Sequence, residues 1–216
     1  MSNTNHHEAA ESRAQGDTTS ASFDAEKVPP APSGNLSIVF TDIKESTALW
    51  ETLPGPMERA TEMHNRVIRD TISLYGGYEV KVIGDAFMIA FPTAASALLW
   101  CMKVQEQLLR TEWPPEILEH THGKEIRDNN GEIIFCGLSV RMGIHWGNPI
   151  AKEDEVTRRK DYIGPMVHRA ARALEFADGG HIVVTGESLV ELRRELTMTE
   201  QEGTAEETGG NARKQA

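Results

Sequence analysis

The chain has few of the residues that hold small secreted domains together or anchor a protein in a membrane. It contains two cysteines, Cys101 and Cys136, which cannot build a disulfide framework. Both stand in apolar surroundings, so we expect buried, inert thiols and a reducing, cytoplasmic location. No apolar run approaches the roughly 20 residues of a membrane-spanning helix. The first residues also lack the basic and apolar regions of a secretory signal.

Basic residues are scarce as well. The 22 lysines and arginines stand against 33 aspartates and glutamates, which gives a formal net charge of −11. Nucleic acids and anionic membranes are bound through clustered basic side chains, so we expect neither as a partner. A nucleotide is not excluded, because divalent cations can neutralise its phosphates on an acidic surface.

Large apolar side chains are nearly missing from the two ends of the chain. Residues 1–34 and 199–216 are rich in small and polar residues, a composition that cannot bury enough surface to order itself. We therefore predict disordered tails at 1–34 and 199–216 and one folded domain at 35–198. Over the whole chain, 39% hydrophobic and 25% charged residues are typical of a globular protein.

Between the tails, the spacing of apolar residues predicts alternating strands and helices. A strand is expected at Leu36–Thr41, followed by a helix from Pro56 to Leu74 that the Gly76-Gly77 pair stops. Two strand-like runs, Tyr78–Ile83 and Ala86–Phe91, flank a two-residue turn and predict a hairpin. The later predicted elements are a helix capped by Thr93 with Ala97, Cys101, Val104 and Leu108 buried, a surface excursion or extra hairpin at 112–135, a strand at Leu138–His145, a helix at 165–177, a strand at His181–Thr185 and a helix at Ser188–Glu195.

This order of elements indicates the fold class. Strand, helix, hairpin, helix and strand form a βαββαβ pattern once the hairpin is counted as two strands. We therefore predict an α/β (α+β) fold of the ferredoxin-like or palm type, with the helices on one face of the sheet. Fold alone does not determine function, so the functional prediction depends on particular side chains.

Two aspartates follow or join predicted strands. Asp42 ends the first strand and Asp85 lies in the hairpin turn. If those strands are neighbours, both carboxylates reach one end of the sheet, where they and phosphate oxygens could hold Mg²⁺. Each aspartate also has an ordinary interpretation, because Asp is common in Gly-Asp turns and as a cap of the segment that follows.

Four segments resemble, in order, the successive motifs of class III nucleotidyl cyclases. They are FTDIKEST (40–47), YGGYEVKVIGDAFMIAF (75–91), RMGIHWGNP (141–149) and DYIGPMVHRAARAL (161–174). The segment TRRKDYIGPMVHRAARA and the insertion before GLSVRMGIHWG are most similar to fungal adenylyl cyclases. The resemblance covers residues 36 to about 195. It implies an enzyme of cyclic AMP signalling that converts ATP to cyclic AMP and pyrophosphate.

The resemblance also implies roles for individual residues. Asp42, Asp85 and the backbone carbonyl of Ile43 fall on the ligands of two Mg²⁺ or Mn²⁺ ions. Lys81 and Asp161 fall on the pair that reads adenine, in which Lys donates to N1 and Asp accepts from the N6 amine. Guanine presents the reverse pattern at those atoms, so ATP is favoured over GTP.

Further implied roles lie on the helix at 165–177. Arg172 falls on the arginine that stabilises charge on the triphosphate during ring closure. His168, four residues before it on the same helix face, replaces the asparagine of the family pattern. His145 is expected to be structural. The resemblance also implies that this chain forms a head-to-tail homodimer, in which the metal ligands come from one subunit and the base-reading residues and arginine from the other.

Two alternatives to an active adenylyl cyclase remain at this point. His168 and the absence of the family's usual C-terminal strands after about residue 198 favour a degenerate domain, which binds nucleotide or a cyclase partner without turnover. The YGG segment at 75–77 also resembles diguanylate cyclases. That family carries acidic residues in the hairpin turn, whereas this hairpin reads VKVIGD.

Overall fold

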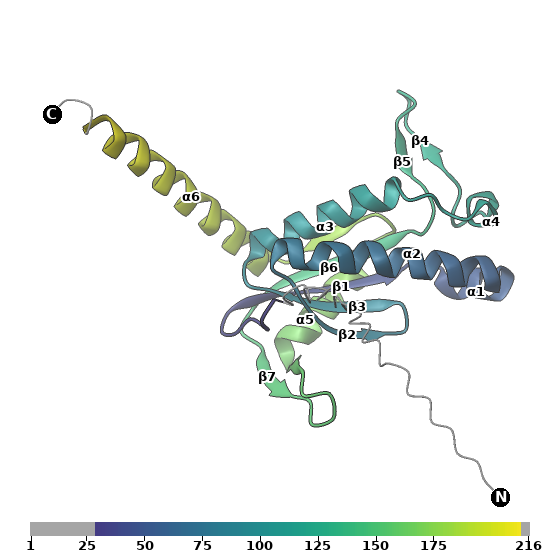
Figure 1. Ribbon diagram of the computed structural model, residues 1–216, viewed down its shortest axis with the longest axis horizontal. Coiled ribbons are helices and arrows are strands. Elements are labelled where there is room, and N and C mark those ends of the chain that lie inside the picture. The colour runs from purple at the N-terminus through teal and green to yellow at the C-terminus, as the bar shows by residue number, and fades with distance from the viewer. Residues whose placement is uncertain (1–28, 213–216) are drawn as a thin grey trace, which may run out of the picture.

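The computed structural model describes residues 29–212 and, of these, the side chains of residues 29–201. Helices and strands alternate along most of the chain (Figure 1). The elements are β1 (Leu36–Ile43), α1 (Ser46–Thr52), α2 (Pro54–Ile72), the 3-10 helix η1 (Ser73–Tyr75), β2 (Tyr78–Ile83), β3 (Ala86–Phe91), α3 (Ala94–Leu109), α4 (Pro115–Glu119), β4 (Ile126–Arg127), β5 (Ile133–Phe135), β6 (Val140–Gly147), β7 (Ile150–Glu153), β8 (Lys160–Ile163), α5 (Pro165–Glu175), β9 (Ile182–Val184) and α6 (Gly186–Ala212).

The main sheet has five strands in the order β2-β3-β1-β6-β9. The central strand β1 runs antiparallel to both β3 and β6, and β6 runs parallel to β9. The first four of these strands, with the helices between them, reproduce the predicted βαββαβ pattern. The hairpin strands β2 and β3 begin and end at the predicted residues.

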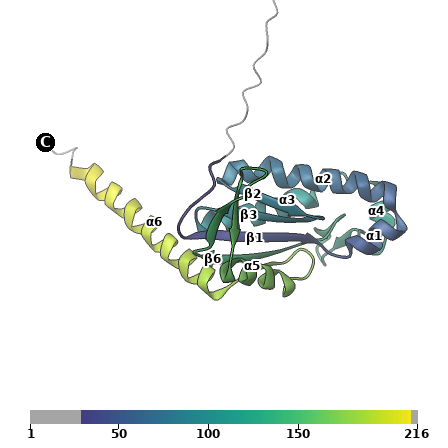
Figure 2. The ribbon, with the colours of Figure 1, turned by 90° about the horizontal axis from the view of Figure 1, so that it is seen from below.

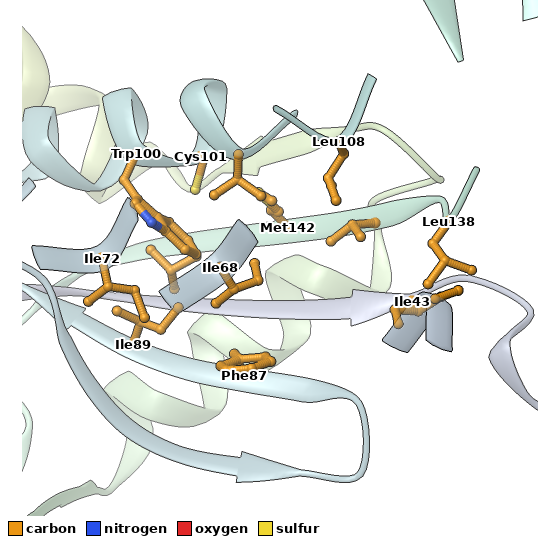
Figure 3. Packing of buried hydrophobic residues seen from close by; sticks show 14 of the residues in the cluster. Ile43, Ile68, Ile72, Phe87, Ile89, Trp100, Cys101, Leu108, Leu138 and Met142 are labelled. Atoms are coloured by element: carbon orange, nitrogen blue, oxygen red, sulfur yellow. The ribbon is translucent and has the colours of Figure 1, made fainter. Parts of the chain in front are cut away.

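Helices α2 and α3 cover one face of the sheet and enclose the larger apolar core (Figure 2). Every second side chain of a strand points to the same face, so Val39 and Ile43 of β1 lie in this core with Phe87 and Ile89 of β3. Figure 3 shows Trp100 of α3 pointing toward Ile68, Ile72 and Ile89, with Ile43 and Leu138 at the other end of the cluster. The predicted apolar stripe of α3 is buried along its whole length, and Thr93 caps the helix by accepting a hydrogen bond from the Ser96 amide.

Helix α5 lies on the opposite face (Figure 2), so the expectation that all helices cover one face is wrong for α5. The second, smaller apolar cluster lies on this face and joins Leu36 and Ile38 to Met166 and Ala170 of α5. The approach of α5 depends on Gly143 of β6. A Cβ atom there would stand 2.3 Å from the backbone nitrogen of Leu174, so no larger residue fits without moving the helix.

Two small ribbons stand apart from the main sheet. Strands β4 and β5 form one of them. The segment 112–135 was predicted to be a surface excursion or an extra hairpin, and it contains this hairpin and the short helix α4. Strands β7 and β8 form the other, which projects from the body in Figure 1. A two-stranded ribbon is marginally stable by itself, so its position depends on contacts with the rest of the domain.

The last helix is longer than predicted. The sequence pattern indicated a helix at Ser188–Glu195, whereas α6 runs from Gly186 to Ala212. The Glu195 carboxylate accepts hydrogen bonds from the amides of Ala94 and Ala95 at 2.9 and 2.8 Å, which attaches α6 to the first turn of α3. The division into a domain at 35–198 and two tails stays a prediction, and residues 1–28 and 213–216 lie outside the described residues.

Both thiols are free. Cys101 is fully buried in the larger core and Cys136 is half-buried, and burial raises the pKa of both thiols. A raised pKa leaves little thiolate at neutral pH, which agrees with the expected inert role. Leu74 departs from its prediction, because α2 ends at Ile72 and the 3-10 turn leaves the Leu74 side chain 72% exposed.

Candidate active site

The two candidate metal ligands lie at one end of the main sheet. Strand β1 ends with Asp42 and Ile43, and β3 begins just after the turn that holds Asp85. The antiparallel register pairs Thr41 with Phe87, so the end of β1 lies beside the β2–β3 turn. The topology therefore brings the two aspartates to the same edge, as the sequence predicted.

Asp42 points to the α5 face and is held there by an arginine that the sequence analysis missed. Arg141 stands opposite Asp42 in the β1–β6 register, and its Nε and Nη2 donate to Asp42 Oδ2 at 2.9 and 2.5 Å. Both bonds go to the same carboxylate oxygen. The pairing could not be read from the sequence, since it depends on the register of strands about 100 residues apart.

Asp85 is in a different electrostatic situation. Its Oδ2 is buried and has no hydrogen-bond partner in the described part of the chain. His64 of α2 is close enough to feel the Asp85 charge, but burial lowers the pKa of His64 to about 4, against the opposing effects of its bond to Asn65 and of that charge. His64 is therefore neutral at pH 7, and the negative charge of Asp85 is not compensated by it.

These observations test whether the site suits a metal ion. A buried carboxylate oxygen without a donor is costly, and a bound cation would satisfy it. Among the described residues, no group of three or more His, Cys, Asp or Glu side chains can hold an ion by itself. Asp42 and Asp85 thus suit an ion that takes its other ligands from a phosphate-bearing substrate, which is how proteins usually hold Mg²⁺.

The predicted base-reading residues meet in the structure. The Lys81 ammonium on β2 donates to both carboxylate oxygens of Asp161 on β8, at 2.9 and 2.8 Å. Both side chains remain partly exposed, at 40% and 29%. They line a cavity of about 310 Å³ together with residues of the β7–β8 ribbon.

A β-bulge decides which way Lys81 points. Glu79 pairs with Ile89 and Lys81 pairs with Met88, so Val80 is an extra residue on β2. Glu79 points to the α2 face, where Arg69 donates to its carboxylate. Regular alternation would send Lys81 to that same face. The extra residue turns it to the opposite face, toward Asp161.

The helix α5 carries the remaining candidates. His168 and Arg172 are both exposed, and neither side chain has a hydrogen bond or ion pair within residues 29–201. Arg172 lines a cavity of about 390 Å³ with His145, Arg169 and Glu187.

His145 has a structural position in that cavity. Its Nδ1 lies 2.9 Å from Thr185 Oγ1, so the ring joins β6 to the segment between β9 and α6. Burial lowers the pKa of His145, with Arg169 acting in the same direction and Glu187 opposing it. This position agrees with the structural role expected for it.

The candidate residues form three separate groups in one chain. The cavity at Lys81 contains neither Arg172 nor Asp42, and the cavity at Arg172 contains neither Lys81 nor Asp42. The base-reading pair and the arginine therefore line different cavities, and Asp42 lines neither of them. Neither of these cavities of a single chain brings together the three groups of residues that the reaction would need.

Comparison with known proteins establishes the family. Residues 28–215 match the adenylate and guanylate cyclase catalytic domain, and the chain belongs to this family. The adenylate cyclase of Mycosarcoma maydis is 51% identical over 195 residues, which are 90% of this chain and 8% of that protein. The adenylate cyclase of Neurospora crassa is 54% identical over 168 residues, which are 78% of this chain and 7% of that protein.

A solved structure agrees with both sequence matches. An adenylate cyclase from Trypanosoma brucei, analysed in its monomeric state, is 35% identical with a TM-score of 0.66 and covers 76% of this chain and 79% of that one. The resemblance to class III cyclases and to their fold is thus confirmed. The chain spans less than a tenth of the length of the two fungal relatives. Between residues 29 and 212, no helix is long and apolar enough to cross a membrane.

Proposed function

We propose that this chain carries an adenylyl cyclase catalytic domain, which converts ATP to cyclic AMP and pyrophosphate in cyclic AMP signalling. The observation that carries the proposal is the Lys81–Asp161 pair. Lysine has three donors and the carboxylate has several lone pairs, so each keeps free capacity beyond their mutual contact. Lys81 can donate to adenine N1 while Asp161 accepts from the N6 amine. Guanine offers a donor at N1 and an acceptor at C6, so it meets the wrong partner at both atoms.

The remaining residues take roles in an intramolecular phosphoryl transfer. Asp42, Asp85 and the Ile43 carbonyl would hold two Mg²⁺ or Mn²⁺ ions, which supply charge neutralisation and make the ribose hydroxyl easier to deprotonate. The 3′-oxygen gives its proton to solvent water and bonds to the α-phosphorus, while the bond from that phosphorus to the bridging oxygen breaks and pyrophosphate leaves. Arg172 donates to the phosphate oxygens as charge moves onto them. His168 lies one helical turn away and would contact the ribose or the same phosphates.

We infer that the active unit is a head-to-tail homodimer. The separation of the three groups of residues in one chain supports this, because a partner chain would bring Lys81, Asp161 and Arg172 over Asp42 and Asp85. Asp42→Ala and Lys81→Ala chains should each be inactive alone. Mixed in equal amounts, they should regain about a quarter of the wild-type activity, because half of the dimers carry one intact site. Heterodimers that form without any activity would contradict shared sites.

The direct test is the product. Purified chain with ATP and Mg²⁺ or Mn²⁺ should release cyclic AMP and pyrophosphate in equal amounts, and Asp85→Asn should not. The specific reason for a second candidate is His168, which replaces the asparagine of the family pattern. A chain that binds ATP with metal, measured by calorimetry, but releases no cyclic AMP would be the degenerate domain instead. The cytoplasmic location expected from the two thiols stays a prediction.

A further inference from the structure

The base-reading pair is held by a set of contacts that none of the roles above uses. The Arg159 guanidinium lies over the ring of Tyr78, with its central carbon 5.2 Å from the ring centroid. Its Nη2 also donates to the backbone carbonyl of Glu79. One residue further, the Lys160 amide donates to Tyr78 Oη at 3.1 Å. These three contacts join the start of β8 to β2.

Arg159 binds the sheet at the β-bulge itself. A bulge disrupts the ladder of hydrogen bonds around its extra residue, here Val80. The Glu79 carbonyl that accepts from Arg159 belongs to the residue directly before Val80. Since the bulge turns Lys81 toward Asp161, the arginine contacts the backbone that fixes the direction of Lys81.

The loop before β8 is shaped to deliver this arginine. The Asp154 carboxylate accepts from the amides of Val156 and Thr157 at 3.1 and 2.7 Å, and Arg158 has a left-handed backbone with φ of 57°. The strands β7 and β8 pair only with each other within the described residues. Together with the packing of Tyr162 and the contacts of α5 with β8, the contacts of Arg159, Lys160 and Asp161 position β8 against β2.

We propose that Arg159 is a positioning residue for nucleotide selection. It holds β8 against the bulge of β2, so that Lys81 and Asp161 keep the spacing that matches the edge of adenine. This inference rests on the proposed function of that pair. Tyr78 contributes the ring and the hydroxyl on which the arginine and the Lys160 amide lie. The guanidinium is needed for its planar shape as well as its charge, because it stacks on a ring and donates at the same time.

The neighbouring arginine gives a matched control. Arg158 lies in the same loop and its side chain is 78% exposed, with an ion pair to Glu153 at 3.3 Å. Arg159→Gln and Arg158→Gln therefore remove the same charge from the same loop, but only the first removes the contacts to β2. The measurement is kcat/KM for ATP and for GTP, from the rates at which cyclic AMP and cyclic GMP form.

We expect the ATP/GTP ratio to fall about tenfold in Arg159→Gln and to stay unchanged in Arg158→Gln, because a small displacement of a binding group has effects of this size or larger. Arg159→Lys keeps the charge without the planar group and should resemble Arg159→Gln. A ratio that Arg159→Gln leaves unchanged, or that Arg159→Lys restores fully, would overturn the inference.

Amide hydrogen exchange separates this inference from the proposed function. In Arg159→Gln, exchange of residues 160–163 should become at least about tenfold faster than in Arg158→Gln, with β1 unchanged, because local opening is set by local contacts. Unchanged exchange in β8 would refute the positioning role even in an active enzyme. Failure of the wild-type chain to make cyclic AMP, with the exchange difference present, would instead refute the proposed function and leave the contact between β8 and β2 established.

Discussion

The two faces of the main sheet are built for different tasks. The face under α2 and α3 is filled with large apolar side chains, among them Trp100 and Phe87. The face toward α5 has a smaller apolar cluster and carries the polar groups Lys81, Asp42 and Arg141 at its margins. One face thus supplies most of the buried surface, and the other displays the chemistry. Substitutions on the two faces should therefore change different measurable quantities.

The largest effect is expected at the metal-ligand end. Asp85→Asn keeps the shape of the side chain but removes its charge, so we expect kcat to fall by about 10³-fold. The free energy of unfolding should stay the same or rise, because a buried oxygen without a partner loses its charge. Turnover and urea unfolding measured on the same preparation check both parts. Turnover similar to wild type would contradict the metal assignment.

Substitutions in the core under α2 and α3 should lower the free energy of unfolding and leave turnover nearly unchanged. Trp100 is fully buried, and its Nε1 donates to Thr71 Oγ1 at 2.9 Å. Trp100→Ala should lower the free energy of unfolding by about 3–5 kcal/mol, through lost burial and the cavity left behind. At a temperature where the variant is still folded, kcat should change little. A loss of kcat as large as that of Asp85→Asn would mean that the two faces are not separate in function.

The stability of the face under α2 and α3 should also depend on pH, because the buried side chain of His64 can be protonated. The pKa of His64 is about 4 in the folded chain because of burial, against about 6.5 when unfolded. The unfolded state therefore binds the proton first as the pH falls, so stability decreases between about pH 6.5 and 4, by up to about 3 kcal/mol. His64→Leu should reduce this loss, as measured by urea unfolding across that range. An equal loss in the variant would assign it to other groups.

On the α5 face, substitutions should change the preference for ATP over GTP more than they change stability. Lys81→Glu with Asp161→Cys reverses the hydrogen-bond pattern offered to the base. The ATP/GTP ratio of kcat/KM should fall by about 10²-fold, because mismatched polar groups are left unpaired. The midpoint of thermal unfolding should move little, since partly exposed ion pairs contribute at most about 1 kcal/mol. An unchanged ratio would mean that these residues do not read the base.

The smallest effect is expected at His168 on the exposed surface of α5. Asparagine at this position would restore the family pattern, and we expect His168→Asn to raise kcat by about tenfold with little change in KM. That combination indicates an interaction made mainly in the transition state. The measurement is steady-state kinetics of the wild-type and His168→Asn chains. Equal or slower turnover in the variant would show that histidine is adapted to this site.

The sequence predicted most of the fold because its signals were local. Alternation and a Gly-Asp turn define β2 and β3, and the strand order then places Asp42 and Asp85 at one end of the sheet. The partners of these residues were not predictable in the same way. Arg141 reaches Asp42 only through the register of β1 and β6, and no spacing in the chain encodes it.

The direction of Lys81 shows the same limit more sharply. Alternation along YEVKVI would place Lys81 on the face of Glu79, against α2, which is the wrong face for reading a base. Only the extra residue Val80 corrects this, and a bulge has no clear mark in a single sequence. The resemblance to a family identified Lys81 and Asp161, but it gave no reason to notice Arg159.

Gly143 has a consequence for how this domain can vary. The closest atom to its missing side chain is a backbone nitrogen of α5, which cannot rotate out of the way as a side chain could. A single methyl group at this position would have to shift the whole helix, and with it the Arg172 guanidinium two residues from the contact. The distance between β6 and α5 is therefore fixed by a contact between two backbones, which leaves no room for a side chain at position 143. Gly143→Ala should test how far the arginine can move before catalysis is lost.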